Sequence, residues 1–211
     1  MSGYKSNFLT NVIFRVDFPP ILSLDSRNPP TKFQSEIKDS FPILEPKPGK
    51  LYEIEISQEV PKVVETKVTR WQFFNKEKTK VVDVASNAII LEYFVYRNFK
   101  EFFNDVDLVF NKFFNIYDVV KISNRIGLRY INQVKIEKGN PFDWENLINP
   151  ELVLVNRDFI SSIKDIKKSM NLLEFQTQVC NLKFQFGMFN SEYPNQIALK
   201  EFALYYDCSI K

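Results

Sequence analysis

A run of alternating residues from Val120 to Ile136 constrains the fold of this chain more than any other stretch. Most of its even positions are apolar, whereas its odd positions carry mainly basic or polar residues, namely Lys121, Ser123, Arg125, Gly127, Arg129, Gln133 and Lys135. This two-residue period predicts a β-strand with one buried face and one polar, basic face. Gly127 lies between two arginines at mid-strand, where a missing side chain weakens a strand unless a ligand, a bulge or a neighbouring backbone needs the room.

The basic face of this strand is the sharpest candidate for a binding site. Arg125 and Arg129 are four residues apart, so their Cα atoms should be separated by about 13 Å. Their long side chains can converge above Gly127 and hold a phosphate or an acidic peptide, because the guanidinium fork fits such oxyanions. We therefore take Arg125, Gly127, Arg129 and Asn132 as candidate ligand-binding residues. In the alternative interpretation, which holds for most arginines, each one pairs with a carboxylate on a neighbouring element and has only a structural role.

The composition excludes several classes of enzyme. The chain has no histidine, so it lacks the base of Ser-His-Asp and Cys-His sites and the usual zinc ligand. Its five glycines form neither a Walker-type phosphate loop nor a G-x-G-x-x-G dinucleotide motif. Cys180 and Cys208 form no C-x-x-C pair, and we expect both to be reduced and buried. We therefore assign no catalytic residue, no metal ligand and no cofactor.

The chain is predicted to be globular, without a strong overall charge. Its 211 residues can bury a real core, and 21 Phe and 9 Tyr make it too aromatic for a disordered chain. A net charge of +2 gives no field for non-specific nucleic-acid binding, and the three lysines of Asn75–Lys80 support a nucleic-acid partner only weakly. No apolar run approaches the ~18 residues of a membrane helix, so we expect a soluble, cytoplasmic protein with no membrane partner.

Strand and helix patterns together predict an α+β fold, with a mostly antiparallel twisted sheet, or sheets, and helices packed on one face. The clearest helix spans 99–117; Asn98 is its N-cap, its phenylalanine stripe packs on the sheet, and Asp105 and Asp107 lie on its solvated side. Weaker helices are expected at 31–41, with Thr31 as the N-cap, at 142–148 and at 158–170. Strands are expected at 11–18, 51–57, 68–74, 81–93, 172–180, 182–189 and 201–209, with a hairpin tip at 75–80 and an extended connection at 42–50.

We expect these elements to form one compact domain over residues 1–211. A strand, a proline break and a short helix occur at 11–41 and again at 125–148, so two similar halves, 1–96 and 97–211, are the alternative. The last strand, close to the end of the chain, is either a free edge or covered by a partner, a second copy or a further segment.

Two glutamates suggest a rival, enzymatic interpretation. Glu53 and Glu55 alternate with apolar residues and so share one face of a strand, where two carboxylates can hold a divalent metal. E-x-E strands of this kind occur in the triphosphate-tunnel enzymes, but Ser57 stands where that pattern has lysine. A solvated strand face is the simpler interpretation.

The run from Arg125 to Asn132 resembles the R-x-G-L-R-Y-x-N hallmark of a sporadically distributed, uncharacterised prokaryotic protein family. The resemblance extends to Val12–Pro20, Trp71–Phe73 and other short stretches in the same order. At Leu204–Asp207 the chain reads L-Y-Y-D where members of that family tend to carry L-D-x-D. The resemblance implies no activity, and the scattered distribution of the family points loosely to mobile or defence-related gene neighbourhoods.

These observations favour a non-enzymatic binding or interaction protein, as part of a prokaryotic defence or toxin–antitoxin-like system. Its basic strand face would hold an anionic small ligand or an acidic partner surface, and a protein partner or self-association is expected. The alternative is an Asp/Glu-metal-dependent phosphohydrolase or nucleotide-processing enzyme, with Glu53 and Glu55 as ligands and the arginines as phosphate clamps.

Overall fold

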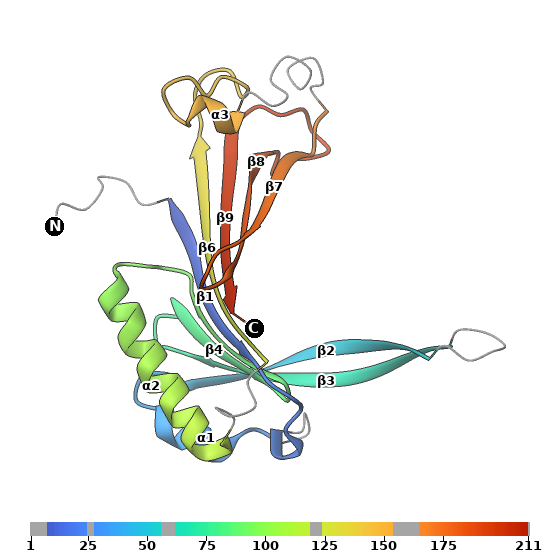
Figure 1. Cartoon of the computed structure of the whole chain (residues 1–211), viewed down its shortest axis with the longest axis vertical. Coiled ribbons are helices and arrows are strands. Elements are labelled where there is room, and N and C mark those ends of the chain that lie inside the picture. Colours follow the sequence, from blue (N-terminus) through green and yellow to red (C-terminus); the bar gives the residue numbers. More distant parts are fainter. Residues whose placement is uncertain (1–7, 25–27, 56–61, 119–123, 154–164, 211) are drawn as a thin grey trace. The chain divides into compact units, whose positions relative to one another are not determined.

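The computed structural model describes residues 8–24, 28–55, 62–118, 124–153 and 165–210, with the backbone alone at 50–55 and 62–67. In these residues nine strands are hydrogen-bonded in the order β2-β3-β4-β5-β1-β6-β9-β8-β7 (Figure 1). The elements are β1 (Leu9–Asp17), η1 (Leu22–Leu24), α1 (Thr31–Ile37), β2 (Ile43–Glu55), β3 (Lys62–Phe74), β4 (Lys80–Ala85), β5 (Ala88–Tyr93), α2 (Phe99–Tyr117), β6 (Arg125–Ile136), α3 (Pro150–Val153), β7 (Lys168–Gln176), β8 (Asn181–Phe189) and β9 (Lys200–Ile210). The mostly antiparallel α+β class is confirmed.

The chain divides into two compact units. Unit 1 consists of Met1–Val12 and Leu128–Ile210, and unit 2 of Ile13–Gly127. The division therefore passes through β1 and β6. That the chain forms one domain, and that its halves are similar, stay predictions.

The core of unit 2 is built around the phenylalanines of α2. Asn98 caps this helix as predicted, because its side chain accepts a hydrogen bond of 2.9 Å from the N–H of Glu101. Phe113 is fully buried and contacts the ring of Phe18, directly after β1, at 5.5 Å and that of Phe33 from α1 at 5.3 Å. These three rings join β1 and both helices in one core, as the spacing predicts. That the helices cover the same face of the sheet stays a prediction.

Several local predictions for unit 2 are wrong, each for a physical reason. Residues 43–50 of the predicted connection 42–50 belong to strand β2, because β2 lies at one end of the strand order and an edge strand tolerates the missing N–H groups of Pro46 and Pro48. The predicted strand 81–93 is two strands, β4 and β5, joined by a two-residue turn without glycine or proline. Thr31 is the first residue of α1, whereas Pro30 occupies its N-cap, and the helix ends at Ile37.

Unit 1 has a second core, on β8, β9 and the segment after β6. Its buried residues are Val134, Phe142, Trp144, Phe186, Met188, Ile197 and Phe202. The helix predicted at 142–148 is absent; turns replace it, because Asn146 adopts the left-handed conformation with φ of 58°. Residues 168–170 of the helix predicted at 158–170 are strand β7, and 154–164 lie outside the described residues.

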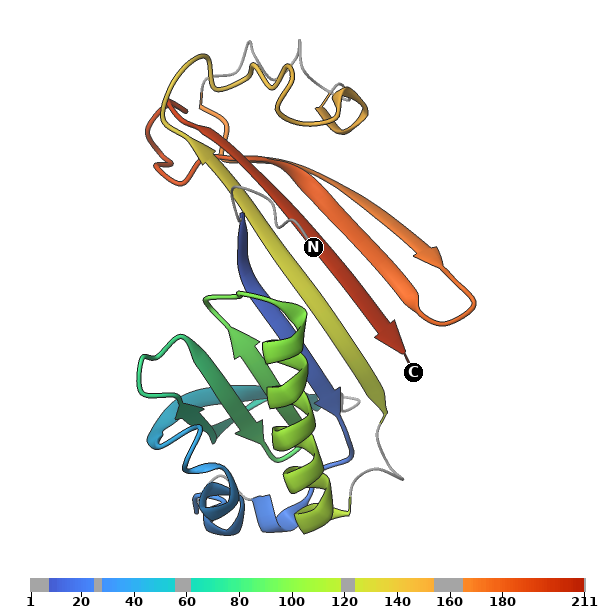
Figure 2. The same ribbon diagram turned by 90° about the vertical axis from the view of Figure 1, so that its left-hand side faces the viewer.

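Strands β8 and β9 form within one residue of their predicted bounds, whereas β7 begins and ends four residues earlier than the predicted strand 172–180. Gly187 in β8 has a φ of 156°, and a Cβ atom there would lie 2.0 Å from the carbonyl oxygen of Ser169. Only glycine therefore allows β7 and β8 to approach each other at this point. Figure 2 shows β7 as the outer strand of the β7–β8 hairpin.

Candidate functional site

Arg125 belongs to a cluster of two arginines around one carboxylate in unit 2. Arg15 of β1 contacts Oδ1 of Asp17 through Nε at 2.7 Å and through Nη2 at 2.6 Å. Nη1 of Arg125 lies 3.5 Å from the other oxygen, Oδ2. The side chains of Arg15 and Arg125 are 40% and 42% exposed, and that of Asp17 is 22% exposed. The cluster thus carries one positive charge more than Asp17 neutralises.

Gly127 leaves room for the guanidinium of Arg125. A Cβ atom on Gly127 would lie 3.5 Å from Nη2 and 3.7 Å from Cζ of Arg125, which is ordinary van der Waals contact. The side chain of Arg125 therefore folds over the glycine. A methyl group fits beside the guanidinium, whereas a larger side chain would displace it. The neighbour that needs this room is a side chain of the same strand.

Arg129 makes a different kind of contact, in unit 1. Its Nε donates a short hydrogen bond to Asp207 of β9, and its Nη2 donates a second one, of 3.0 Å, to the other carboxylate oxygen. This two-point pair satisfies Asp207 with one arginine. Asn132 is partly buried, and its side chain makes no hydrogen bond to the described residues. The four predicted residues are thus divided between the two units, with Arg125 and Gly127 in unit 2.

The strand face predicted to be basic is largely neutralised. Lys135, the third described cation on it, lies 3.1 Å from Glu201, whose carboxylate is 2% exposed. Burial works to raise the pKa of Glu201, but the hydrogen bonds from the N–H and hydroxyl of Ser191 and the contact with Lys135 outweigh it and lower the pKa. The alternation of burial also fails at Ile126, which is 38% exposed.

A second polar cluster in unit 2 corrects the prediction for Asp105. This carboxylate on α2 is only 15% exposed and accepts hydrogen bonds from the ammonium of Lys80 and the hydroxyl of Tyr93. Burial, followed by the hydrogen bond to Asp105, raises the pKa of Tyr93 well above its usual range. Asp105 therefore ties α2 to strands β4 and β5 and does not belong to a solvated face.

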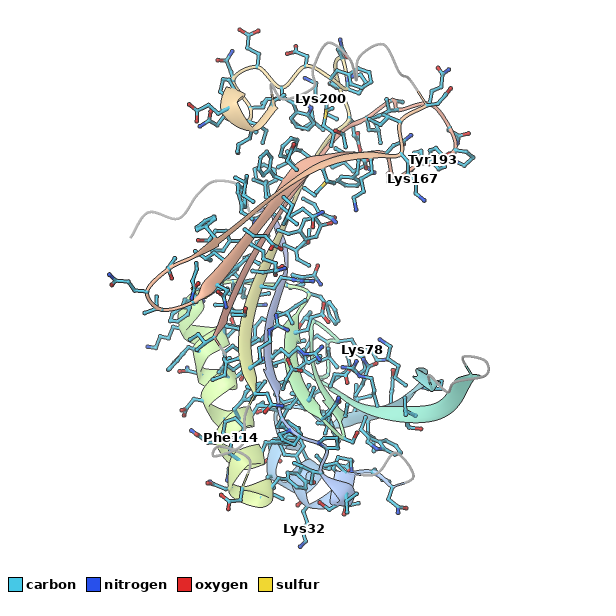
Figure 3. The ribbon with its side chains drawn as sticks, turned by 45° about the vertical axis from the view of Figure 1, so that its right-hand side comes forward. Lys32, Lys78, Phe114, Lys167, Tyr193 and Lys200 are labelled. Carbon is cyan, nitrogen blue, oxygen red and sulfur yellow. The ribbon has the colours of Figure 1, made fainter. Side chains whose placement is uncertain are left out.

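Lys80 and Tyr93 of this cluster line a pocket of about 490 Å³, between the β3–β4 hairpin tip and the start of α2. Cations and anions line it in equal number: Lys76, Lys80 and Arg97, and Asp39, Glu77 and Glu101. The pocket therefore has no clear preference for anions. At the same tip Lys78, labelled in Figure 3, pairs with Glu45 at 2.5 Å, so a neighbouring carboxylate offsets its charge.

The described side chains offer no metal site to support the enzymatic interpretation. The side chains of Glu53 and Glu55 lie outside the described residues. Among the side chains that are described, no three from His, Cys, Asp and Glu are grouped so that they could hold a metal ion. The described helices also include none that is long and apolar enough to cross a membrane.

Sequence reasoning missed Asp17 and Asp207 as partners of the arginines. Asp17 lies within the predicted first strand, and only the pairing of β1 with β6, seen in the hydrogen bond from Asn124 N–H to Asp17 O, brings it to Arg125. Asp207 is the last residue of the L-Y-Y-D stretch in β9, where the chain departs from the L-D-x-D of the family pattern. No protein-family model matches the chain, and comparison with curated proteins finds no match, so the family resemblance stays a prediction.

Proposed function

We propose that the protein is a non-catalytic binding protein and that Arg125 contacts an anionic ligand or an acidic partner surface. The observation that supports this proposal is the surplus guanidinium in the Arg15–Asp17–Arg125 cluster. Arg15 alone holds Asp17 through two short contacts, so Arg125 can turn to an incoming carboxylate or phosphate without leaving a partly buried aspartate unpaired.

Arg129 has a lesser role in this proposal. Its guanidinium already makes two hydrogen bonds to Asp207, and a ligand would have to replace both. An external anion therefore gains less from Arg129 than from Arg125, whose one contact with Asp17 is 3.5 Å long. Asn132 remains a proposed ligand residue on the strength of its position in the strand alone.

Gly127 would allow the ligand to approach. The guanidinium of Arg125 lies over this glycine, and 42% of the arginine side chain is open to solvent. A larger residue at position 127 would displace the guanidinium from its place above the strand. The proposal thus assigns Gly127 a role in positioning Arg125. The link to a prokaryotic defence or toxin–antitoxin-like system rests on the resemblance alone.

Partner capture with matched arginine variants tests the proposal. Arg125→Gln removes the surplus charge and leaves Asp17 paired with Arg15, so capture should fall at least tenfold while the melting temperature stays within about 2 °C. Arg129→Gln is the control, because it removes a comparable charge from the same strand and should preserve most of the capture. Equal capture by wild type and Arg125→Gln would disprove the role of Arg125.

A further inference from the structure

Strand β7 presents an apolar edge that a globular protein usually protects. It is the last strand in the hydrogen-bonded order. In its C-terminal half, the side chains of Leu172, Leu173 and Phe175 are 54%, 50% and 49% exposed. The opposite end of the order, β2, carries prolines at positions 46 and 48, which block strand addition. In contrast, β7 has neither proline nor glycine. Such an edge is a template for another strand.

Two hydrogen bonds show which backbone groups of β7 face this edge. The N–H of Thr177 donates to Cys180 O at 2.9 Å, and that of Asn190 donates to Lys167 O at 3.0 Å. Both bonds continue the β7–β8 register, and hydrogen-bonded positions alternate along an antiparallel pair. The odd residues of β7 therefore bond to β8. The even residues direct their N–H and C=O groups to the open edge; they are Lys168, Met170, Leu172, Glu174 and Gln176.

We propose that two copies of this chain pair through their β7 strands, antiparallel, about a two-fold axis at Asn171. In this register Lys168 lies opposite Glu174 of the second copy, and Met170 lies opposite Leu172 of the second copy. Opposite charges and apolar side chains thus match at the residues whose backbone groups face the edge. A shift of two residues would place Glu174 opposite Met170 and remove the charge match, so the sequence selects this register.

The charges already present on the hairpin agree with this pairing. Lys168 is exposed and has no ion-pair partner among the described residues, so it is available to the second copy. Glu174 pairs with Lys183 of β8, and both side chains are more than half exposed. The Glu174 carboxylate can accept from Lys183 and from Lys168 of the second copy together. The four matched residue pairs provide about eight backbone hydrogen bonds between the two copies.

Complementary charge variants test the register. Lys168→Glu places like charges at both contacts of its own dimer, and Glu174→Lys does the same with the opposite sign. Each variant alone should dimerise at least tenfold more weakly than wild type in analytical ultracentrifugation. An equimolar mixture of the two restores opposite charges at both contacts and should form the heterodimer. Circular dichroism of each variant verifies that it is folded.

A cysteine cross-link locates the axis independently of charge. In this register Asn171 of one copy lies directly opposite Asn171 of the second copy. Their Cα atoms would be about 4.5 Å apart, a distance that a disulfide can span. In a Cys180→Ser/Cys208→Ser background, Asn171→Cys should give a disulfide-linked dimer on oxidation. Ser169→Cys is the control; its copies would be offset by four residues, about 13 Å, and should not be linked. A wild-type chain that is monomeric at about 100 μM, equal cross-linking at both positions, or a mixture of charge variants that stays monomeric would overturn the proposal.

Discussion

The pair formed by Lys80 and Asp105 should stabilise unit 2 far more than a surface ion pair. Their side chains are 17% and 15% exposed, and removing one partner of a fully buried pair costs 3–5 kcal/mol. Because some solvent reaches both groups, we expect Lys80→Met and Asp105→Asn each to lower the free energy of unfolding by about 3 kcal/mol, at the lower end of that range. The double variant should cost about 4 kcal/mol, which gives a coupling energy of about 2 kcal/mol.

Urea unfolding of the four proteins measures this coupling energy directly. Lys112 and Glu36 provide the matched control, because they also join α2 to another element but are 43% and 45% exposed. Their coupling energy should stay below about 0.5 kcal/mol. If the Lys80–Asp105 coupling is equally small, the carboxylate behaves as a solvated group and the argument from its burial is wrong.

Three further predictions follow from single side chains. Gly187→Ala should lower the free energy of unfolding by about 3 kcal/mol or more, because the new Cβ would overlap a backbone oxygen. Gly49→Ala is the control: its Cβ would have a nearest contact of 3.4 Å, so the urea midpoint should change little. The pKa of Glu201 is lowered on folding, so the stability that this carboxylate contributes is complete above its ordinary pKa near 4.5 and is lost as the pH falls through the folded-state pKa. Glu201→Gln should therefore flatten the decline of the urea midpoint between pH 5 and pH 3. An unchanged decline would refute this. Burial, with a hydrogen bond to a neighbouring thiol, raises the pKa of Cys208 to about 11, so its alkylation at pH 8 should be much slower than that of a free cysteine, and a rate equal to that of the free thiol would contradict it.

Local sequence signals predicted the elements whose geometry depends on neighbouring residues. Asn98 and the phenylalanine spacing defined α2, because capping and helical period are both encoded within a few residues. The hairpin tip between β3 and β4 was similarly clear: Asn75 accepts hydrogen bonds from the N–H groups of Thr79 and Lys80, as turn asparagines often do.

Features decided by distant residues could not be predicted in this way. Pro46 and Pro48 suggest a connection unless β2 is known to be an edge strand, which is a property of the whole sheet. Arg129 and Asp207 are 78 residues apart, so nothing near the arginine reveals its partner. For Asp105, the spacing predicted a solvated face, but Lys80 and Tyr93 reach this carboxylate from strands β4 and β5.

The central claim is that Arg125 is free to meet an external anion because Arg15 already holds Asp17. Titration of the ¹⁵N-labelled chain with inorganic pyrophosphate and with an oligoglutamate peptide, observed at the arginine Nε–H resonances, tests it most directly. We predict that the Arg125 resonance shifts with at least one of the two probes, that the Arg129 resonance shifts much less, and that Arg125→Gln weakens binding at least tenfold. Larger shifts at Arg129 than at Arg125, or no shift at Arg125 with either probe, would contradict the account.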